Sequence, residues 1–288
     1  MASLKEIKSR ISSINGTLKI TSAMKMVASA KLHKAQAAIE GMLPYQEGLS
    51  RILSTVLHSE QGETSPFALP NEGRKVAVVA FSSNSSLCGG FNANVIRRLA
   101  SWLDTCSQEV GKENVLVYPV GRKVAEAVRK LGYVPEGDFQ ILSGKPGYAE
   151  SAELASVLMD RYLSGEVRRI DFLYHHFRST SSQELTCETY LPLALAAGEE
   201  EGSTAADSIV EPSPQQVIAA LLPKVLRLRV YTVALDSSAS EHAARTMAMQ
   251  VATDNANDLI QELTLLYNKS RQQAITNELL DIVGGTMA

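Results

Sequence analysis

Residues Lys224–Val283 read KVLRLRVYTVALDSSASEHAARTMAMQVATDNANDLIQELTLLYNKSRQQAITNELLDIV, and these 60 consecutive positions contain neither glycine nor proline. The segment therefore permits one helix, which at about 1.5 Å per residue would span roughly 90 Å. Thr253, Asp254 and Asn255 interrupt an apolar stripe that lies near heptad spacing, at Met247, Val251, Leu259, Leu263, Leu266 and Ala274. The polar breaks indicate a surface that contacts a partner without being locked to it.

A second candidate helix lies at the other end of the chain. Ser3 can cap its N-terminus, and apolar residues then alternate at spacings of three and four, at Leu4, Ile7, Ile11, Ile14 and Leu18. After Leu18 the stripe is expected to slip to Ile20, Met24, Val27 and Ala28, and then to Leu32 and Ala35. We expect this helix to reach about Gly41 or Pro44, and a separate helix to run from Tyr45 to about His58.

Each terminal helix has only a narrow apolar stripe, and packing the two against each other as an antiparallel pair would bury both stripes. On pattern alone, the outer helices of an ordinary helical bundle are the stronger alternative. The stretch from Glu60 to Arg74 is rich in Gly, Pro and Ser, and is typical of a linker.

The middle of the chain has a different periodicity. A short continuous apolar run at 76–81 suits a strand buried on both faces, and further strands are predicted at 115–120, 169–177 and 185–191. Segments 122–131 and 149–163 predict helices between them. This alternation predicts an α/β domain with a largely parallel sheet and helices on both faces, closed by the acidic, turn-rich stretch 198–214. We therefore expect three regions, at 1–60, 75–197 and 213–288.

Composition excludes several classes of protein. The net charge is −3 with a pI near 6.0, so bulk charge does not favour nucleic acid or anionic lipid as a partner. Residues 1–40 nevertheless have seven basic side chains against two acidic ones, which makes this segment a basic element on an acidic body. Three cysteines without CxxC spacing argue against a disulfide framework and for a reducing compartment. No window approaches 18 uninterrupted apolar residues, so we expect no direct membrane insertion.

No pattern predicts catalysis, a cofactor or a metal ion. The loop Ser82–Gly90 follows a strand and precedes a helix, where a phosphate could bind, but its glycines do not follow GxGxxG. Ser143-Gly144-Lys145-Pro146 is similar to the end of a P-loop, but Phe139 and Pro146 stand where Gly and Ser or Thr are required. His175-His176 lacks metal-ligand spacing. We expect structural roles for all three.

Four motifs carry a resemblance to a known family. The stretch ITSAMKMVA at 20–28, followed by Ala30-Lys31-Leu32, resembles the N-terminal signature of ATP synthase gamma subunits, and ITNELLDIVGG at 275–285 resembles their C-terminal one. LCGGFN at 87–92 and SEHAAR at 240–245, continuing to Ala252–Asn255, supply two further matches in family order. Ser22 and Thr286 depart from the basic residue and the Ala that the family often has there.

The resemblance implies a fold and a role. The fold is an antiparallel coiled coil of the N- and C-terminal helices with an inserted Rossmann-like α/β domain. The role is that of a noncatalytic central rotor shaft, which couples proton-driven rotation of a membrane c-ring to ATP synthesis or hydrolysis on partner beta subunits. Implied partners are three alpha and three beta subunits, epsilon and the c-ring. The implied location is the cytoplasmic face of the bacterial inner membrane, through partner subunits.

The resemblance also assigns residues. Met24, with Lys25 beside it, matches the position that faces an acidic loop of a beta subunit. The positions that bind a beta-subunit loop or tune coupling are matched by Arg245, Gln272, Thr276 and Glu278. Candidates for the foot above the ring are Lys34, Tyr45, Glu211 and Gln215. The rival functions are a nucleotide-binding enzyme built on the α/β domain and a coiled-coil nucleic-acid scaffold, although the basic helix lacks interleaved aromatics.

Overall fold

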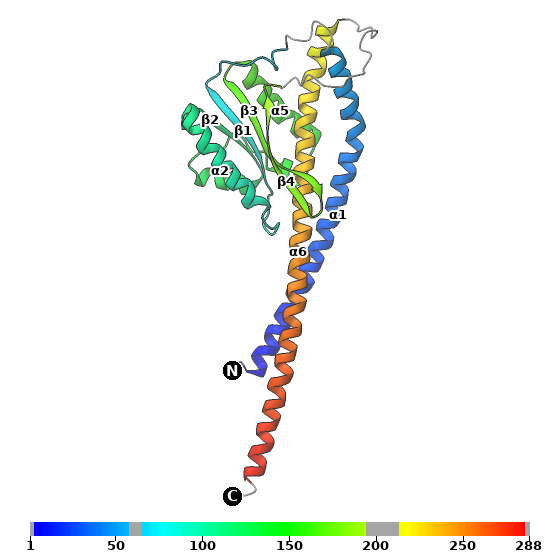
Figure 1. Ribbon diagram of the computed structural model, residues 1–288, viewed down its shortest axis with the longest axis vertical. Coiled ribbons are helices and arrows are strands. Elements are labelled where there is room, and N and C mark those ends of the chain that lie inside the picture. The colour runs from blue at the N-terminus through cyan, green and yellow to red at the C-terminus, as the bar shows by residue number, and fades with distance from the viewer. Residues whose placement is uncertain (1–2, 58–64, 194–212, 286–288) are drawn as a thin grey trace.

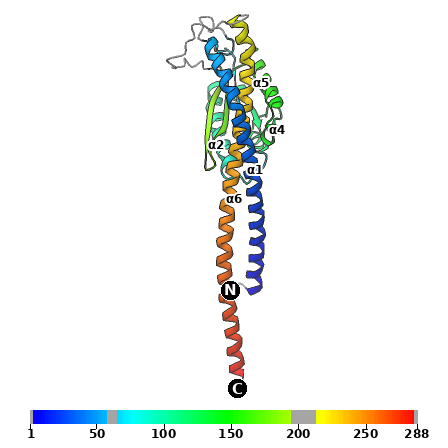
Figure 2. The same ribbon diagram turned by 90° about the vertical axis from the view of Figure 1, so that its right-hand side faces the viewer.

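Two long helices form the axis of the molecule. The computed structural model describes residues 3–57, 65–193 and 213–285. Helix α1 (Leu4–Leu57) lies alongside α6 (Pro214–Gly285), a helix of 72 residues, and the two run antiparallel (Figure 1). The view turned by 90° shows the α/β domain confined to the end far from both termini (Figure 2). The predicted antiparallel pair with an inserted domain is confirmed.

The inserted domain contains four strands and several shorter helices. Its strands are β1 (Lys75–Phe81), β2 (Val115–Val120), β3 (Val167–Ser179) and β4 (Ser182–Leu191). Its helices are α2 (Phe91–Val110), the 3-10 turn η2 (Lys112–Asn114), α3 (Arg122–Lys130), α4 (Gln140–Gly144) and α5 (Tyr148–Leu163). All the predicted strands and helices of this region are present, with small differences at their ends.

The sheet has the order β2-β1-β3-β4. Strand β1 pairs in parallel with β2 and with β3, whereas β4 returns antiparallel to β3. The hairpin closes where Ser179 pairs with Ser182, which is why β3 extends beyond the predicted range 169–177. The expectation of a largely parallel sheet is confirmed, with β4 as its one antiparallel strand among the described residues.

Helices cover both faces of the sheet, as alternating strand residues require. Val76, Val78 and Ala80 of β1 point to the face packed by α2 and α3. Ala77 and Val79 point to the opposite face, where α5 and α6 pack. Because α6 is also half of the axial pair, the core of the domain and the shaft share one helix.

A strip of apolar side chains on α6 closes the second face. Leu222, Leu226, Val230 and Val233, which we call the apolar strip, are buried at spacings of three and four, and they belong to the same core cluster as Phe172 and Tyr190. The Tyr190 hydroxyl also donates to the Leu226 carbonyl at 3.1 Å. Burying such side chains contributes about 1.5–3 kcal/mol each.

The predicted break near Pro44 is wrong, because α1 continues through it to Leu57. A proline inside a helix removes the hydrogen bond to the carbonyl four residues earlier, here that of Glu40. Pro44 and Glu40 are both exposed, so water can satisfy this carbonyl. Leu49, beyond the proline, is buried and keeps the helix against its partner.

Helix α6 likewise begins earlier than its glycine- and proline-free stretch suggests. It starts at Pro214 and contains Pro223. The start near Gln215 that the sequence predicts for this region is therefore confirmed. Ile218 and Leu222 are buried just before Pro223, and Leu226 just after it, so packing against the sheet holds the helix across the proline.

The line of contact between α1 and α6, which we call the seam, keeps one heptad phase. The buried residues of α1 at steps of seven or fourteen are Ile7, Thr21, Ala28, Ala35 and Leu49, with Leu32 beside them. The expected slip to Ile20 and Val27 is wrong, since both are largely exposed. Leu32 and Ala35 pack on Ala239 and Ala243, small residues that let the two backbones approach. The seam therefore accepts polar Thr21 rather than shift its phase.

Candidate partner interface

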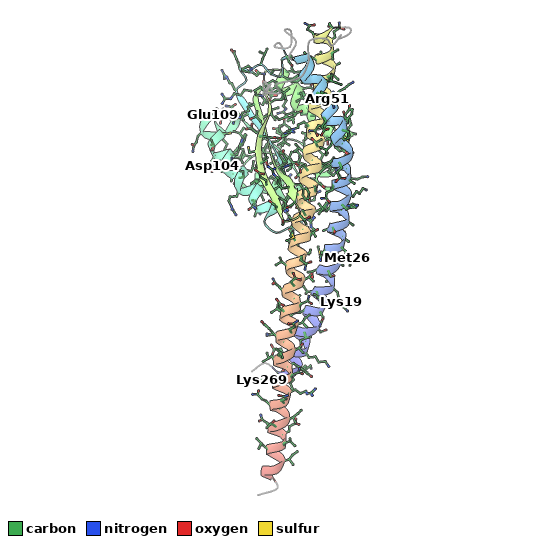
Figure 3. The ribbon with its side chains drawn as sticks, turned by 45° about the vertical axis from the view of Figure 1, so that its right-hand side comes forward. Lys19, Met26, Arg51, Asp104, Glu109 and Lys269 are labelled. Carbon is green, nitrogen blue, oxygen red and sulfur yellow. The ribbon has the colours of Figure 1, made fainter. Side chains whose placement is uncertain are left out.

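We call the part of α1 and α6 that lies below the α/β domain in Figure 1 the lower shaft. Apolar side chains are exposed on its surface. Met26 of α1 is 66% exposed, and it points away from α6 below the domain (Figure 3). Further exposed apolar residues on both helices are Ile20, Val27, Val251, Leu259, Leu265 and Leu266. Surfaces of this kind mark contacts with other proteins. Sequence alone assigned Met26 no contact, because the phase of the seam depends on α6.

Met24 and Lys25, which the resemblance selects, are both half-buried. They lie next to the more exposed Met26 and Val27 on the same turns of α1. Their assignment as partner contacts stays a prediction. In the structure they adjoin exposed apolar side chains on the surface of α1.

The basic side chains of α1 are mostly free to meet a partner. Lys5, Lys8 and Lys19 are exposed, and Lys19 projects from the lower shaft (Figure 3). Within the described ranges, no carboxylate lies within ion-pair distance of these three lysines, whereas Arg10 pairs with Glu6 at 2.8 Å. That exposed pair contributes little stability. The α1 side of the shaft is therefore a cationic surface.

The C-terminal end of α6 has no partner from α1. Facing residues have numbers that total about 274, as Thr21 and Thr253 do, so Leu4 at the beginning of α1 faces a position near 270. Residues 271–285, which we call the tip, extend as a single helix by roughly 20 Å. Figure 1 shows the C-terminus well beyond the N-terminus.

The tip contains three of the predicted contact residues, Gln272, Thr276 and Glu278, and all three are exposed. The Thr276 hydroxyl donates to the Gln272 carbonyl at 2.9 Å, one turn earlier. The same short helix exposes four large apolar side chains, Ile275, Leu279, Leu280 and Ile282. Sequence alone did not assign these four, because their exposure depends on where α1 ends.

Arg245 lies elsewhere. Its side chain is 9% exposed, and its guanidinium donates to the Ser85 hydroxyl at 2.8 Å in the loop that follows β1. It also forms an ion pair with Glu241. The structure therefore separates Arg245 from the exposed tip residues and places it where the α/β domain meets α6. Its role as a beta-subunit contact stays a prediction.

The foot residues are spread along the upper half of the molecule. Tyr45 and Gln215 are exposed near the end opposite the tip. Lys34 is also exposed, but it precedes Leu57 by a length of helix of roughly 35 Å, so it lies well away from that end. Glu211 lies outside the described residues. Arg51 marks the upper end of α1 (Figure 3).

The three suspected chemical motifs have structural contacts. In the motif at 143–146, the Ser143 hydroxyl donates to the Ser82 carbonyl at 2.7 Å. Of the histidine pair, His175 stacks on Phe91, while His176 Nδ1 lies 2.6 Å from the Asp236 carboxylate on the other face of the strand. Over the described ranges, no group of His, Cys, Asp and Glu side chains has the arrangement of a metal site.

Two histidines on or next to α6 are buried. Burial lowers the pKa of His175 to about 4, and burial together with the charges of Arg245 and Lys31 lowers that of His242 to about 4. Both imidazoles are therefore neutral at pH 7. Over the same ranges, no helix combines the length and apolar character needed to cross a bilayer.

Comparison with known proteins finds one family over the whole chain. A sequence model described as ATP synthase matches residues 3–288. The chain is 62% identical over 290 residues to the ATP synthase gamma chain of Phocaeicola vulgatus, and the match covers 100% of both chains. It is 58% identical over 293 residues to that of Bacteroides fragilis, again with 100% of both covered. Against that of Flavobacterium johnsoniae, identity is 42% over 289 residues, covering 100% of this chain and 99% of the relative.

Solved structures share the fold at low identity. A chain of the rotor of the Euglena gracilis mitochondrial ATP synthase aligns with a TM-score of 0.61 and 18% identity, covering 94% of this chain and 98% of the other. A chain in the central stalk and c-ring structure of the Tetrahymena thermophila enzyme aligns with a TM-score of 0.56 and 20% identity, covering 81% and 99%. These likenesses concern the arrangement of helices and sheet.

Proposed function

This chain belongs to the ATP synthase family as a gamma chain, and on that premise we propose that it is the noncatalytic rotor shaft of a bacterial F-type enzyme. Its tip and lower shaft would turn inside a ring of three alpha and three beta subunits. Its α/β domain and foot would meet epsilon and the membrane c-ring. The complex would then hold it at the cytoplasmic face of the inner membrane without an insertion of its own.

The observation that carries this proposal is the unpaired tip. A single helix with four exposed large apolar side chains is poorly suited to water. It suits a narrow socket made by other subunits, because a lone helix is only about 10–12 Å wide. Its polar residues Gln272, Thr276 and Glu278 would bind the beta subunits through contacts that are broken and remade as the shaft turns.

The asymmetry of the lower shaft supports a mechanical role. In one direction it presents the lysines of α1 together with Met24, Lys25 and Met26, and in another the polar and apolar side chains of α6. A beta subunit that meets each side in turn experiences different contacts, and such differences select between conformations. Exposed lysines attract acidic loops over a distance without fixing one geometry. The chemistry would belong to the beta subunits.

Arg245 fits this scheme less directly than the other assigned residues, because its guanidinium already binds within the chain. We retain it as part of the coupling surface through its neighbours on α6. For the foot, Tyr45 and Gln215 are the favoured ring-side contacts, since they lie at the end opposite the tip.

Reconstitution tests the proposal. Alpha and beta subunits are assembled with and without this chain, and ATP hydrolysis and rotation of a bead attached to the α/β domain are recorded. We expect faster hydrolysis than in the chain-free hexamer, and unidirectional rotation. A complex that binds the chain but shows neither effect would contradict a rotor function. Binding of ATP or NAD to the chain alone would favour the rival nucleotide-binding enzyme instead.

A further inference from the structure

We propose that Arg245 is a positioning residue that fastens the α/β domain to the shaft, so that the two turn as one body. This inference rests on the proposed rotor function for its purpose, but not for its geometry. We call the group formed by Arg245, Glu241, Ser85 and Ser86 the clasp.

The clasp joins segments far apart in the sequence. The Arg245 guanidinium donates to the Ser85 hydroxyl at 2.8 Å and approaches the Ser85 and Ser86 carbonyls at 3.4 Å each. Glu241, one turn earlier on α6, forms an ion pair with the same guanidinium. A planar guanidinium can hold several acceptors at once in a fixed geometry, which a lysine cannot do. The contact of Arg245 therefore depends on the positions of all three acceptor oxygens of the loop.

The loop is ordered to receive this contact. Asn92 accepts from the Ser83 amide at 3.0 Å, and its own amide group donates to the Ser83 hydroxyl at 2.8 Å. Leu87, at φ 67°, is the one non-glycine residue with positive φ among the described residues. Such a conformation costs about 1–3 kcal/mol and persists where its surroundings fix it. The conformation of this loop is therefore fixed by its own hydrogen bonds.

Because the charged groups of the clasp are buried, removing one of them destabilises the chain. Glu241 and Arg245 are 7% and 9% exposed. Burial raises the pKa of the Glu241 carboxyl, and the hydrogen bond and charge of Arg245, with the charge of Lys31 on α1, offset part of that rise. Removing one charge of such a pair leaves the other uncompensated. The clasp thus joins α6 to the loop of the α/β domain through a buried charge pair.

The position of the clasp gives it a mechanical meaning. The apolar strip holds the sheet against α6 near Leu226 and Val230, and Arg245 lies farther along the same helix by roughly 25 Å. The sheet also contacts α6 between these positions, where Asp236 accepts from the Phe177 amide at 2.7 Å and the Ser240 hydroxyl donates to the His175 carbonyl at 3.0 Å. The clasp adds a contact beyond these, made by the loop that follows β1, and a longer series of contacts along the axis resists pivoting of the domain against the shaft.

A double-mutant cycle on the full-length chain tests the contact. Ser85→Ala alters the domain side, and Arg245→Gln with Glu241→Gln alters the shaft side without leaving a buried charge. The readout is hydrogen exchange of the amides in 82–92, with α5 as internal reference. We expect each change to speed exchange in this loop by about tenfold and the combination to add little more, while α5 stays protected. Additive effects, or no change in the loop, would overturn the clasp.

An engineered crosslink supplies a second, independent test. A Cβ built on Gly89 would lie 3.9 Å from the Ala248 Cβ, a separation that a disulfide can span. In the glutamine double variant, with Cys88→Ser to prevent mispairing, G89C and A248C are oxidised and then reduced. We expect the oxidised chain to recover loop protection and, in the reconstituted complex, rotation under an external load. Equal performance of the oxidised and reduced chains under load would contradict a mechanical role.

The two proposals fail separately. Exchange in the isolated chain reports on the clasp even if the complex does not turn. Loss of rotation with an intact clasp would count against the rotor function alone.

Discussion

The side-chain oxygens of Thr21 and Thr253 lie 3.0 Å apart across the seam, although 232 positions separate the two residues in the sequence. Each hydroxyl also lies within hydrogen-bond distance of a carbonyl on its own helix, that of Leu18 or Met249. Two hydroxyl protons serve three possible bonds, so one bond is always missing. The contact fixes the alignment of α1 and α6 at little gain in stability.

This pair allows a prediction on the seam. Thr21→Val alone and Thr253→Val alone should each lower the free energy of unfolding by about 0.5–1.5 kcal/mol or less, since the remaining hydroxyl keeps its carbonyl. The double valine variant should recover the loss, because two apolar groups then meet. Urea unfolding of the full chain measures all three. A double variant that keeps the loss of stability of a single variant would show that the hydroxyl pair itself stabilises the seam.

The apolar strip predicts a large effect at one leucine. Leu226→Ala removes a buried side chain between α6 and the sheet, and should lower the free energy of unfolding by about 2–5 kcal/mol. Leu265→Ala on the same helix is the matched control, because that side chain is 71% exposed, and a change below about 0.5 kcal/mol is expected. Thermal unfolding of both variants measures the two losses. Similar losses at the two positions would show that the strip is not the main attachment.

The buried histidines predict a loss of stability in mild acid. His175 and His242 have pKa values of about 4 in the folded chain, below the ordinary 6.5. Their contribution is complete above pH 6.5 and falls as the pH drops toward 4, because the unfolded chain takes up protons first. At pH 5 the loss is about 2 kcal/mol for each histidine.

The variant His242→Gln checks this sign. Its free energy of unfolding should fall less between pH 7 and 5 than that of the parent chain, by about 2 kcal/mol. His33→Gln on the exposed face of α1 is the control, and should follow the parent. Parallel curves for parent and H242Q would mean that His242 is protonated in the folded chain.

The cationic side of α1 predicts salt-dependent assembly. Replacing Lys5, Lys8 and Lys19 by Gln should slow association with the alpha–beta hexamer and flatten its dependence on salt, since these exposed charges act at long range. Arg129, Lys130 and Lys145, changed to Gln together, alter the net charge equally but lie on the α/β domain. Stopped-flow association at several salt concentrations measures both triples. Equal slowing would assign the effect to net charge and not to the shaft.

The exposed leucines of the tip predict a loss of affinity for the alpha–beta hexamer. Leu279→Ser with Leu280→Ser should leave the folded chain as stable as the parent, because both side chains are exposed and α1 does not reach them. Affinity for the hexamer should fall by about tenfold or more, as for buried apolar anchors in other interfaces. Titration of labelled chain with the hexamer measures it. Unchanged affinity would place the socket elsewhere on the shaft.

Those parts of the fold that depend on local rules could be predicted from the sequence. Absence of Gly and Pro over Lys224–Val283 was enough for a long helix, and continuous apolar runs were enough for strands such as 76–81. The predicted break near Pro44 was wrong because propensity treats a proline as the end of a helix. Packing on both sides of Pro44, as of Pro223, overrides that preference, and packing partners are not visible along a single chain.

The interface was harder to predict than the fold. The phase of the seam depends on α6, so Ile20 and Val27 could not be assigned to the outside from α1 alone. Arg245 is a polar residue on a helix, which normally faces water, yet loop residues some 160 positions away cover it. The family resemblance found the tip polar residues, whereas their apolar neighbours required knowledge of where α1 ends.

The placement of the axial helices at opposite ends of the chain also governs how the protein is made. During synthesis α1 leaves the ribosome before α6, and about 160 residues between Leu57 and Pro214 must be made before α6 begins to emerge. Until then the seam residues of α1 have no partner helix. One face of the sheet also stays uncovered during this time, because residues Leu222–Val233 of α6 cover it in the folded chain. Contacts between distant segments form slowly and leave apolar surface open to aggregation meanwhile. Until α6 is released, a newly made chain therefore exposes apolar surface that the folded chain buries.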